Sequence, residues 1–208
     1  MIRNTALALC AALCLCAGRI NGDIIPIGQF DGEYTDDFGS YPFSAHATLD
    51  IFGGFATITR TNTAGSIKIE FSSQLGDDLV QHRSPDRMMG QLSELVWVFD
   101  EPVSHFGGWW ENNSRFDHAV VDFYDASDNL LASLNANVPQ DAQAWTWNGW
   151  QSTDVGIKKI VTNGNDVEFL NGFIWYEDMQ AIEMVPEPGA MGVLIGCGLL
   201  LGRRGRRN

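Results

Sequence analysis

Acidic residues gather at two places in the sequence, and their oxygen atoms suit a hard cation. One cluster, near the start of the acidic region, consists of Asp31, Glu33, Asp36 and Asp37, and the second consists of Glu177 and Asp178. Ca²⁺ takes about six to eight oxygen ligands from carboxylates and carbonyls. If the first and last strands of a domain lie side by side, Asp36, Asp37, Glu177 and Asp178 form a candidate site for a structural Ca²⁺. The alternative interpretation is a solvated acidic surface.

Tryptophan is the second residue type that could take part in binding, and the chain has seven. The flat face of an indole stacks on a sugar ring, while nearby amides and carboxylates bond its hydroxyls. Trp109, Trp110 and Trp147 are the candidate sugar-stacking residues. Adjacent residues of a strand point to opposite faces, so one ring of the pair Trp109 and Trp110 must face outward. The alternative is that these indoles fill a hydrophobic core.

No pattern typical of catalysis stands out. The four histidines are scattered, without metal-ligand spacing, and there is no G-x-S-x-G motif. Two carboxylates at a suitable separation can hydrolyse a glycoside, but among 26 acidic residues some pair meets that condition by chance. We therefore expect no enzyme, with a secreted hydrolase as the second alternative.

Composition narrows the classes of function. The chain has 208 residues, 45% of them hydrophobic, and a net charge of −13, which suits one domain with accessory segments. All acidic residues lie between Asp23 and Glu187. They give this region a negatively charged surface, which repels the phosphates of nucleic acids, so no nucleic-acid partner is expected. The four cysteines lie outside this region, which excludes a disulfide or a zinc–cysteine cluster from it.

Short alternating segments rich in β-branched and aromatic residues follow one another through this region, separated by Gly, Asn and Asp. The expected strands are Ala47–Ile51, Phe55–Arg60, Ser66–Phe71, Leu95–Phe99, Val103–Trp110, Ala119–Tyr124, Leu130–Leu134, Ala144–Trp150, Ile157–Val161 and Phe169–Tyr176. No long helical period interrupts them. The pattern predicts an all-β fold, an antiparallel β-sandwich.

The two ends have a different character. Residues 1–22 combine Arg3 with an apolar run, which predicts a signal peptide cleaved after Gly18 or Gly22. At the other end, Val185–Pro188 precedes the apolar segment Gly189–Gly202, followed by the basic residues Arg203, Arg204, Arg206 and Arg207. A helix over Gly189–Gly202 would span about 21 Å, less than the roughly 30 Å of bilayer hydrocarbon. We expect a short, weakly held transmembrane helix.

The order of Pro186-Glu187-Pro188, apolar segment and arginine tail resembles the C-terminal sorting signal of PEP-CTERM proteins. The resemblance implies processing near Pro186, Glu187 and Pro188 by an exosortase-type sorting protease, and a bacterium that makes exopolysaccharide. The region before it is similar to galactose-binding-like, jelly-roll domains at Ile51–Ala56, Val98–Val103, Phe106–Trp109, Val121–Asp125 and Trp175–Gln180. Such modules carry a structural Ca²⁺ near their termini, which the resemblance extends to the acidic clusters here.

Together these observations predict a signal peptide at 1–22, a β-sandwich ectodomain at 23–183 and a sorting signal at 184–208. The expected protein is exported, anchored in the membrane by its C-terminal helix, and then displayed at the cell surface or in the extracellular matrix. It is expected to be non-enzymatic and associated with exopolysaccharide. The first alternative is a carbohydrate-binding module supported by Ca²⁺.

Overall fold

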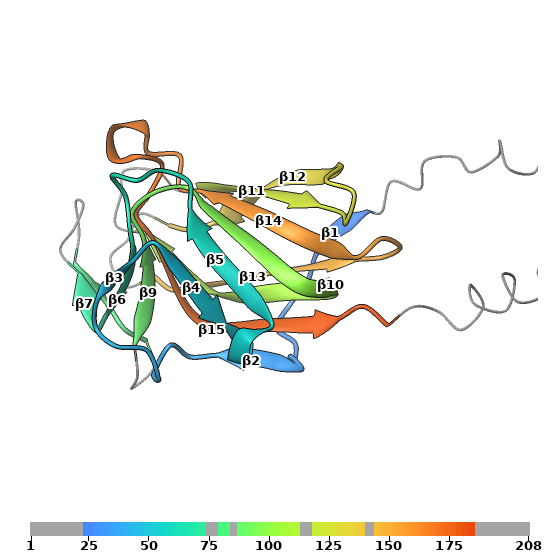
Figure 1. Ribbon diagram of the computed structural model, residues 1–208, viewed down its shortest axis with the longest axis horizontal. Helices are drawn as coiled ribbons and strands as arrows, with labels where there is room; N and C mark the ends of the chain where they lie inside the picture. Colours follow the sequence, from blue (N-terminus) through green and yellow to red (C-terminus); the bar gives the residue numbers. More distant parts are fainter. Residues whose placement is uncertain (1–22, 74–78, 84–86, 113–117, 140–143, 186–208) are drawn as a thin grey trace, which may run out of the picture.

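The computed structural model describes residues 23–73, 79–83, 87–112, 118–139 and 144–185, and every structural statement below refers to these residues. Their regular structure is β-strand, apart from two short 3₁₀ turns at Phe52–Gly54 and Val167–Phe169. The predicted all-β class is confirmed, with a large antiparallel sheet that is consistent with a β-sandwich (Figure 1).

One long strand, β10 (Leu95–Asn112), belongs to two groups of strands. Its first half pairs with β5 on one side and β14 on the other, antiparallel in both cases. This group lies in the order β12 (Leu130–Asn137), β11 (His118–Tyr124), β14 (Ile157–Asn163), β10, β5 (Ala56–Arg60), β4 (Thr48–Ile51). In Figure 1, β11, β12 and β14 lie above β15 and β2.

The second half of β10 pairs with β13 on one side and β15 on the other, so the same strand is central to both groups. Strand β15 also pairs with β2 and β9, which extends this group further. Its members are β1 (Ile24–Pro26), β13 (Thr146–Ser152), β10, β15 (Ile174–Glu183), β2 (Tyr34–Asp36), β9 (Met88–Gln91), β6 (Ile67–Glu70) and β3 (Ala45–His46). Strands β7 (Ser72–Ser73) and β8 (Val80–Gln81) form a separate hairpin.

Aromatic rings fill the core between the two groups of strands. Trp97 from the first half of β10 contacts Phe106 from its second half, with ring centroids 5.4 Å apart. Tyr176 of β15 lies between Trp97 and Trp110, at 5.2 and 4.8 Å. All four side chains are fully buried. Alternate residues of a strand share a face. Both halves of β10 therefore direct alternate side chains into the same core.

Several expected strand boundaries differ from the structure, two of them markedly. The segments Leu95–Phe99 and Val103–Trp110 were expected as separate strands, but they form one strand with a shift of register between Val98 and Val103. The strand expected over Phe169–Tyr176 begins at Ile174 instead. Leu170 and Phe173 have positive φ angles of 62° and 71°, a left-handed conformation that breaks a strand.

The expected membrane anchoring is corrected. Within the described ranges, no helix is both long enough and apolar enough to cross a membrane. This finding contradicts the expected anchoring of the protein by a C-terminal helix. Residues 189–202, on which that expectation rested, lie outside the described residues, as does the expected signal peptide at 1–22.

Candidate functional site

Pairing of β2 with β15 brings the two acidic clusters together, as expected for the first and last strands of a sandwich. Asp36 lies opposite Met179, next to Asp178. Beside this pairing the surface has a hollow of about 590 Å³. Its lining is mostly polar and consists of Gln29, Thr35, Asp36, Asp37, Ser40, Tyr41, Gly53, Arg83, Trp109, Asp178 and Gln180.

Asp36 is a buried carboxylate with several donors around it. Its Oδ1 accepts a hydrogen bond from the Phe38 amide at 2.9 Å, and its Oδ2 accepts one from the Phe52 amide at 2.9 Å. The Tyr41 hydroxyl lies 2.6 Å from the same Oδ2. Burial, together with the hydrogen bond to Asp36, raises the pKa of Tyr41. Asp36 therefore links the end of β2 to the 3₁₀ turn that follows β4.

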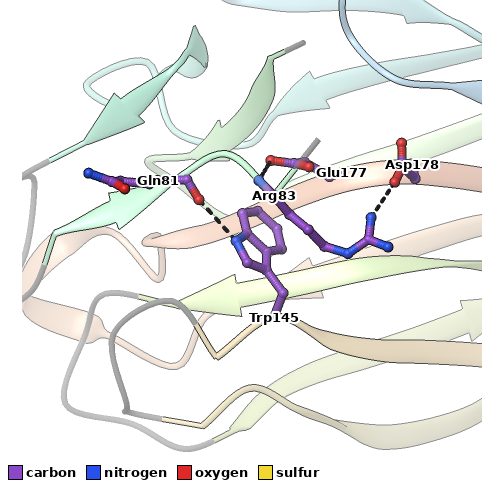
Figure 2. Close-up of polar contacts among 5 residues, drawn as sticks. All are labelled: Gln81, Arg83, Trp145, Glu177 and Asp178. Atoms are coloured by element: carbon purple, nitrogen blue, oxygen red, sulfur yellow. Dashed lines mark hydrogen bonds and ion pairs between the residues drawn. The ribbon is translucent and has the colours of Figure 1, made fainter. Parts of the chain in front are cut away.

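The second acidic pair binds one arginine from two sides (Figure 2). Glu177 Oε1 accepts a hydrogen bond from the backbone amide of Arg83 at 2.6 Å, and Asp178 Oδ2 pairs with its guanidinium at 2.6 Å. Asp178 has a φ of 47° and lies where the register between β10 and β15 shifts, between Gly107 and Trp109. This bulge places one extra residue on β15, beside the hollow.

The four residues expected to bind Ca²⁺ lie near one another, but not all of them face the hollow. Asp36, Asp37 and Asp178 line the hollow, whereas Glu177 does not. No group of three or more His, Cys, Asp or Glu residues suited to a metal occurs in the described part of the chain. Asp36 and Asp178 already accept bonds from protein donors, and Asp37 Oδ1 accepts one from the Gly39 amide at 2.8 Å. The arrangement gives no support to the expected calcium site.

Trp109 and Trp110 point to opposite sides, as strand geometry predicts. Trp109 is half-buried and lines the hollow. Trp110 is fully buried, with Trp150 and Tyr176 against its ring at 5.4 and 4.8 Å. Trp110 is therefore a core residue, and the expectation that it stacks on a sugar is wrong.

Trp147 lies flat on the sheet instead of projecting from it. A Cβ added at Gly149 would approach its Nε1 to 2.7 Å, and one added at Gly107 would approach its Cζ2 to 3.0 Å. These two glycines leave room for the indole, whereas a residue with a side chain would collide with it. The Trp147 ring is nearly perpendicular to the rings of Trp109 and Phe30, with centroid distances of 6.0 and 5.7 Å. Trp147 is not part of the lining of the hollow, and it supports Trp109 from the side.

Arg83 is a site residue that the sequence did not single out, as are Gln29, Ser40 and Gln180 from the same lining. Its guanidinium carbon lies 4.1 Å from the centre of the Trp109 ring. A lone arginine distant in sequence from Trp109 gives no local signal of such a contact. The segment that carries it is fixed by Trp145, whose Nε1 donates to the Gln81 carbonyl at 3.0 Å (Figure 2).

Of the four histidines, His105 packs against an aromatic ring outside the hollow. The His105 ring lies against Phe30 at 5.3 Å with Ser104 Oγ 2.8 Å from its Nδ1, and burial lowers its pKa. His105 is not part of the lining of the hollow. The expected sorting residues lie outside the described residues: Pro186, Glu187, Pro188, Arg203, Arg204, Arg206 and Arg207.

Comparison with known proteins gives only distant likenesses. No family model matches the chain, and no curated protein matches it. The K2 cleaved adhesin domain of Lys-gingipain is 13% identical, with a TM-score of 0.43 over 71% of this chain and 96% of its own. CsCBM6-3 from Clostridium stercorarium, solved with cellobiose, is 10% identical, with a TM-score of 0.27 over 79% of this chain and 95% of its own. The enzymatically active domain of bacteriophage CBA120 tailspike protein 4 is 14% identical, with a TM-score of 0.35 over 62% of this chain and 19% of its own.

Proposed function

We propose that this chain is a carbohydrate-binding β-sandwich protein and that the hollow beside β2 and β15 is its binding site. The observation that carries the proposal is the half-buried Trp109 ring in the wall of an otherwise polar hollow. Its volume of about 590 Å³ lies within the range of about 300–1,000 Å³ typical of ligand sites. Asp37, Gln29 and Ser40 supply carboxylate, amide and hydroxyl groups for sugar hydroxyls.

The proposed role is binding without catalysis, with a polysaccharide of the exopolysaccharide type as ligand. Glycoside hydrolysis requires one carboxyl group that donates a proton and a second that acts as base or nucleophile. In this hollow, Asp36 and Asp178 both accept hydrogen bonds from protein groups. Both carboxylates are therefore already engaged by donors of the protein itself. Release of reducing ends from a polysaccharide that the protein binds would contradict this part of the proposal.

A glycan array with the full chain tests the proposal, followed by calorimetry on the oligosaccharides that bind. Trp109→Ala is expected to weaken binding at least tenfold, since stacking on this ring is lost. Phe71→Ala removes another aromatic ring that is 46% exposed and does not line the hollow, so it serves as the control. Absence of any bound glycan, or equal affinity in Trp109→Ala, would reject the site.

Processing near Pro186–Pro188 by an exosortase-type protease stays a prediction. The intact mass of the protein from native cells checks it. A chain that ends near Pro188 is expected, and a chain that retains Arg203–Asn208 would contradict processing.

A further inference from the structure

The guanidinium of Arg83 lies over the Trp109 ring in the wall of the hollow. The Arg83 guanidinium lies 4.1 Å from the centre of the Trp109 ring and 2.6 Å from Asp178 Oδ2. An indole face attracts a cation through its quadrupole, and a carboxylate attracts it by charge. A positive group at this position is therefore held between the Trp109 ring on one side and the Asp178 carboxylate on the other.

The Arg83 guanidinium and its carboxylate partner are both accessible to solvent. The side chains of Arg83 and Asp178 are 36% and 32% exposed, and an ion pair exposed to this extent contributes little to stability. The backbone of Arg83 is held separately, through its amide and Glu177 Oε1. The guanidinium can therefore leave the ring while the segment stays in place.

The charge around this position favours a cationic ligand. Asp36, Asp37 and Asp178 line the hollow together with one guanidinium, and the whole chain has a net charge of −13. A uronate or a sulfated sugar would bring a further negative charge to this lining. A sugar with a protonated amine would bring the charge that Arg83 now supplies.

We infer that the saccharide bound here carries free amino groups, as an oligomer of glucosamine does, and that its ammonium group takes the place of the Arg83 guanidinium between Trp109 and Asp178. The sugar ring then stacks on Trp109 while the ammonium pairs with Asp178. This inference rests on the proposed carbohydrate binding and specifies its ligand class.

Calorimetry with the full chain at pH 6 tests the ligand class. The probes are a glucosamine hexamer, its fully N-acetylated counterpart and an oligouronate of similar length. We expect the free-amine hexamer to bind about tenfold more tightly than the acetylated one, and the oligouronate to bind most weakly. Equal affinity for both hexamers, or tighter binding of the oligouronate, overturns the inference and leaves carbohydrate binding intact. Absence of binding to all three, with no glycan bound on the array, overturns both.

Three variants distinguish a specific contact of the ammonium group with Asp178 from general attraction of a cationic ligand to an acidic protein. Asp178→Asn is expected to weaken binding of the free-amine hexamer about tenfold, and Arg83→Ala to tighten it, because an internal competitor is removed. Asp128→Asn is the matched control. Asp128 also has a positive φ, 65° against 47° at Asp178, and also pairs with a cation, Lys159. An equal loss in both asparagine variants, or weaker binding in Arg83→Ala, overturns the exchange.

Discussion

Replacement of Asp36 by asparagine tests whether this carboxylate is structural. Its two oxygens accept from the amides of Phe38 and Phe52, and the Tyr41 hydroxyl bonds the second oxygen. Asparagine has the same shape but only one acceptor oxygen. In either orientation of the amide, one backbone N–H faces an NH₂ group and loses its acceptor. Asp36 is only 8% exposed, so water cannot fully compensate.

The magnitude follows from this count of bonds. An unsatisfied buried donor costs about 1–3 kcal/mol, and the remaining bonds lose the strength that a charged acceptor gives. We expect Asp36→Asn to lower the free energy of unfolding by about 2–4 kcal/mol. Tyr41→Phe removes the hydroxyl that lies 2.6 Å from Asp36 Oδ2 and 2.9 Å from the Asp50 carbonyl, and it is expected to cost about 1–2 kcal/mol. The double variant is expected to lose less than the sum, because the two residues share a bond.

Urea unfolding followed by tryptophan fluorescence measures these differences through the midpoint and slope. Asp37→Asn is the control, since Asp37 is exposed and its Oδ1 accepts from the Gly39 amide, a turn that asparagine makes equally well. We expect it to stay within about 0.5 kcal/mol of the parent. Equal midpoints for the Asp36 and Asp37 variants would refute the reasoning. A calcium-dependent rise in the parent midpoint that Asp36→Asn abolishes would instead make Asp36 a metal ligand.

Three further predictions concern the core and the tyrosines. Trp110→Ala is expected to lower the free energy of unfolding by about 3–5 kcal/mol because its ring is fully buried, whereas Trp109→Ala is expected to lose much less; urea midpoints compare them. Gly90→Ala is expected to cost about 1–3 kcal/mol, since its Cβ would lie 2.2 Å from the buried Trp175 ring, and thermal unfolding checks it. Burial raises the pKa of all four tyrosines. A raised folded-state pKa favours the neutral form, so this stability is complete below about pH 10 and lost as the pH rises further. An absorbance titration in which half of the tyrosine is already ionised at pH 10 in the folded protein would contradict it.

Local pattern was sufficient for much of the fold. Alternation predicted strands near β6, β11 and β14, because half-buried strands carry apolar residues at every second position. The same rule placed Trp109 and Trp110 on opposite faces. The meeting of the two acidic clusters followed from an expectation about the ends of a sandwich, and the pairing of β2 with β15 confirms it.

What the sequence could not give depends on contacts between distant residues. The bulge at Asp178 arises from the register of β15 against β10, which no local pattern encodes. The position of Arg83 on Trp109 depends on distant contacts such as the Trp145–Gln81 hydrogen bond, which joins residues 64 apart in sequence. Trp147 looked suited to binding, but Gly149 on its own strand and Gly107 on the neighbouring β10 allow it to lie flat.

The pairing of β2 with β15 also determines when the hollow can form during synthesis. Gly32 bonds Gln180 and Tyr34 bonds Glu183, contacts that span 148 and 149 residues. The ribosome adds about 5–20 residues per second, so β2 emerges many seconds before its partner exists. Contacts of such long range also slow folding. The hollow must therefore be among the last parts of the molecule to appear, and a nascent chain that stops before Ile174 would contain Asp36 and Trp109 without the strand that completes the site.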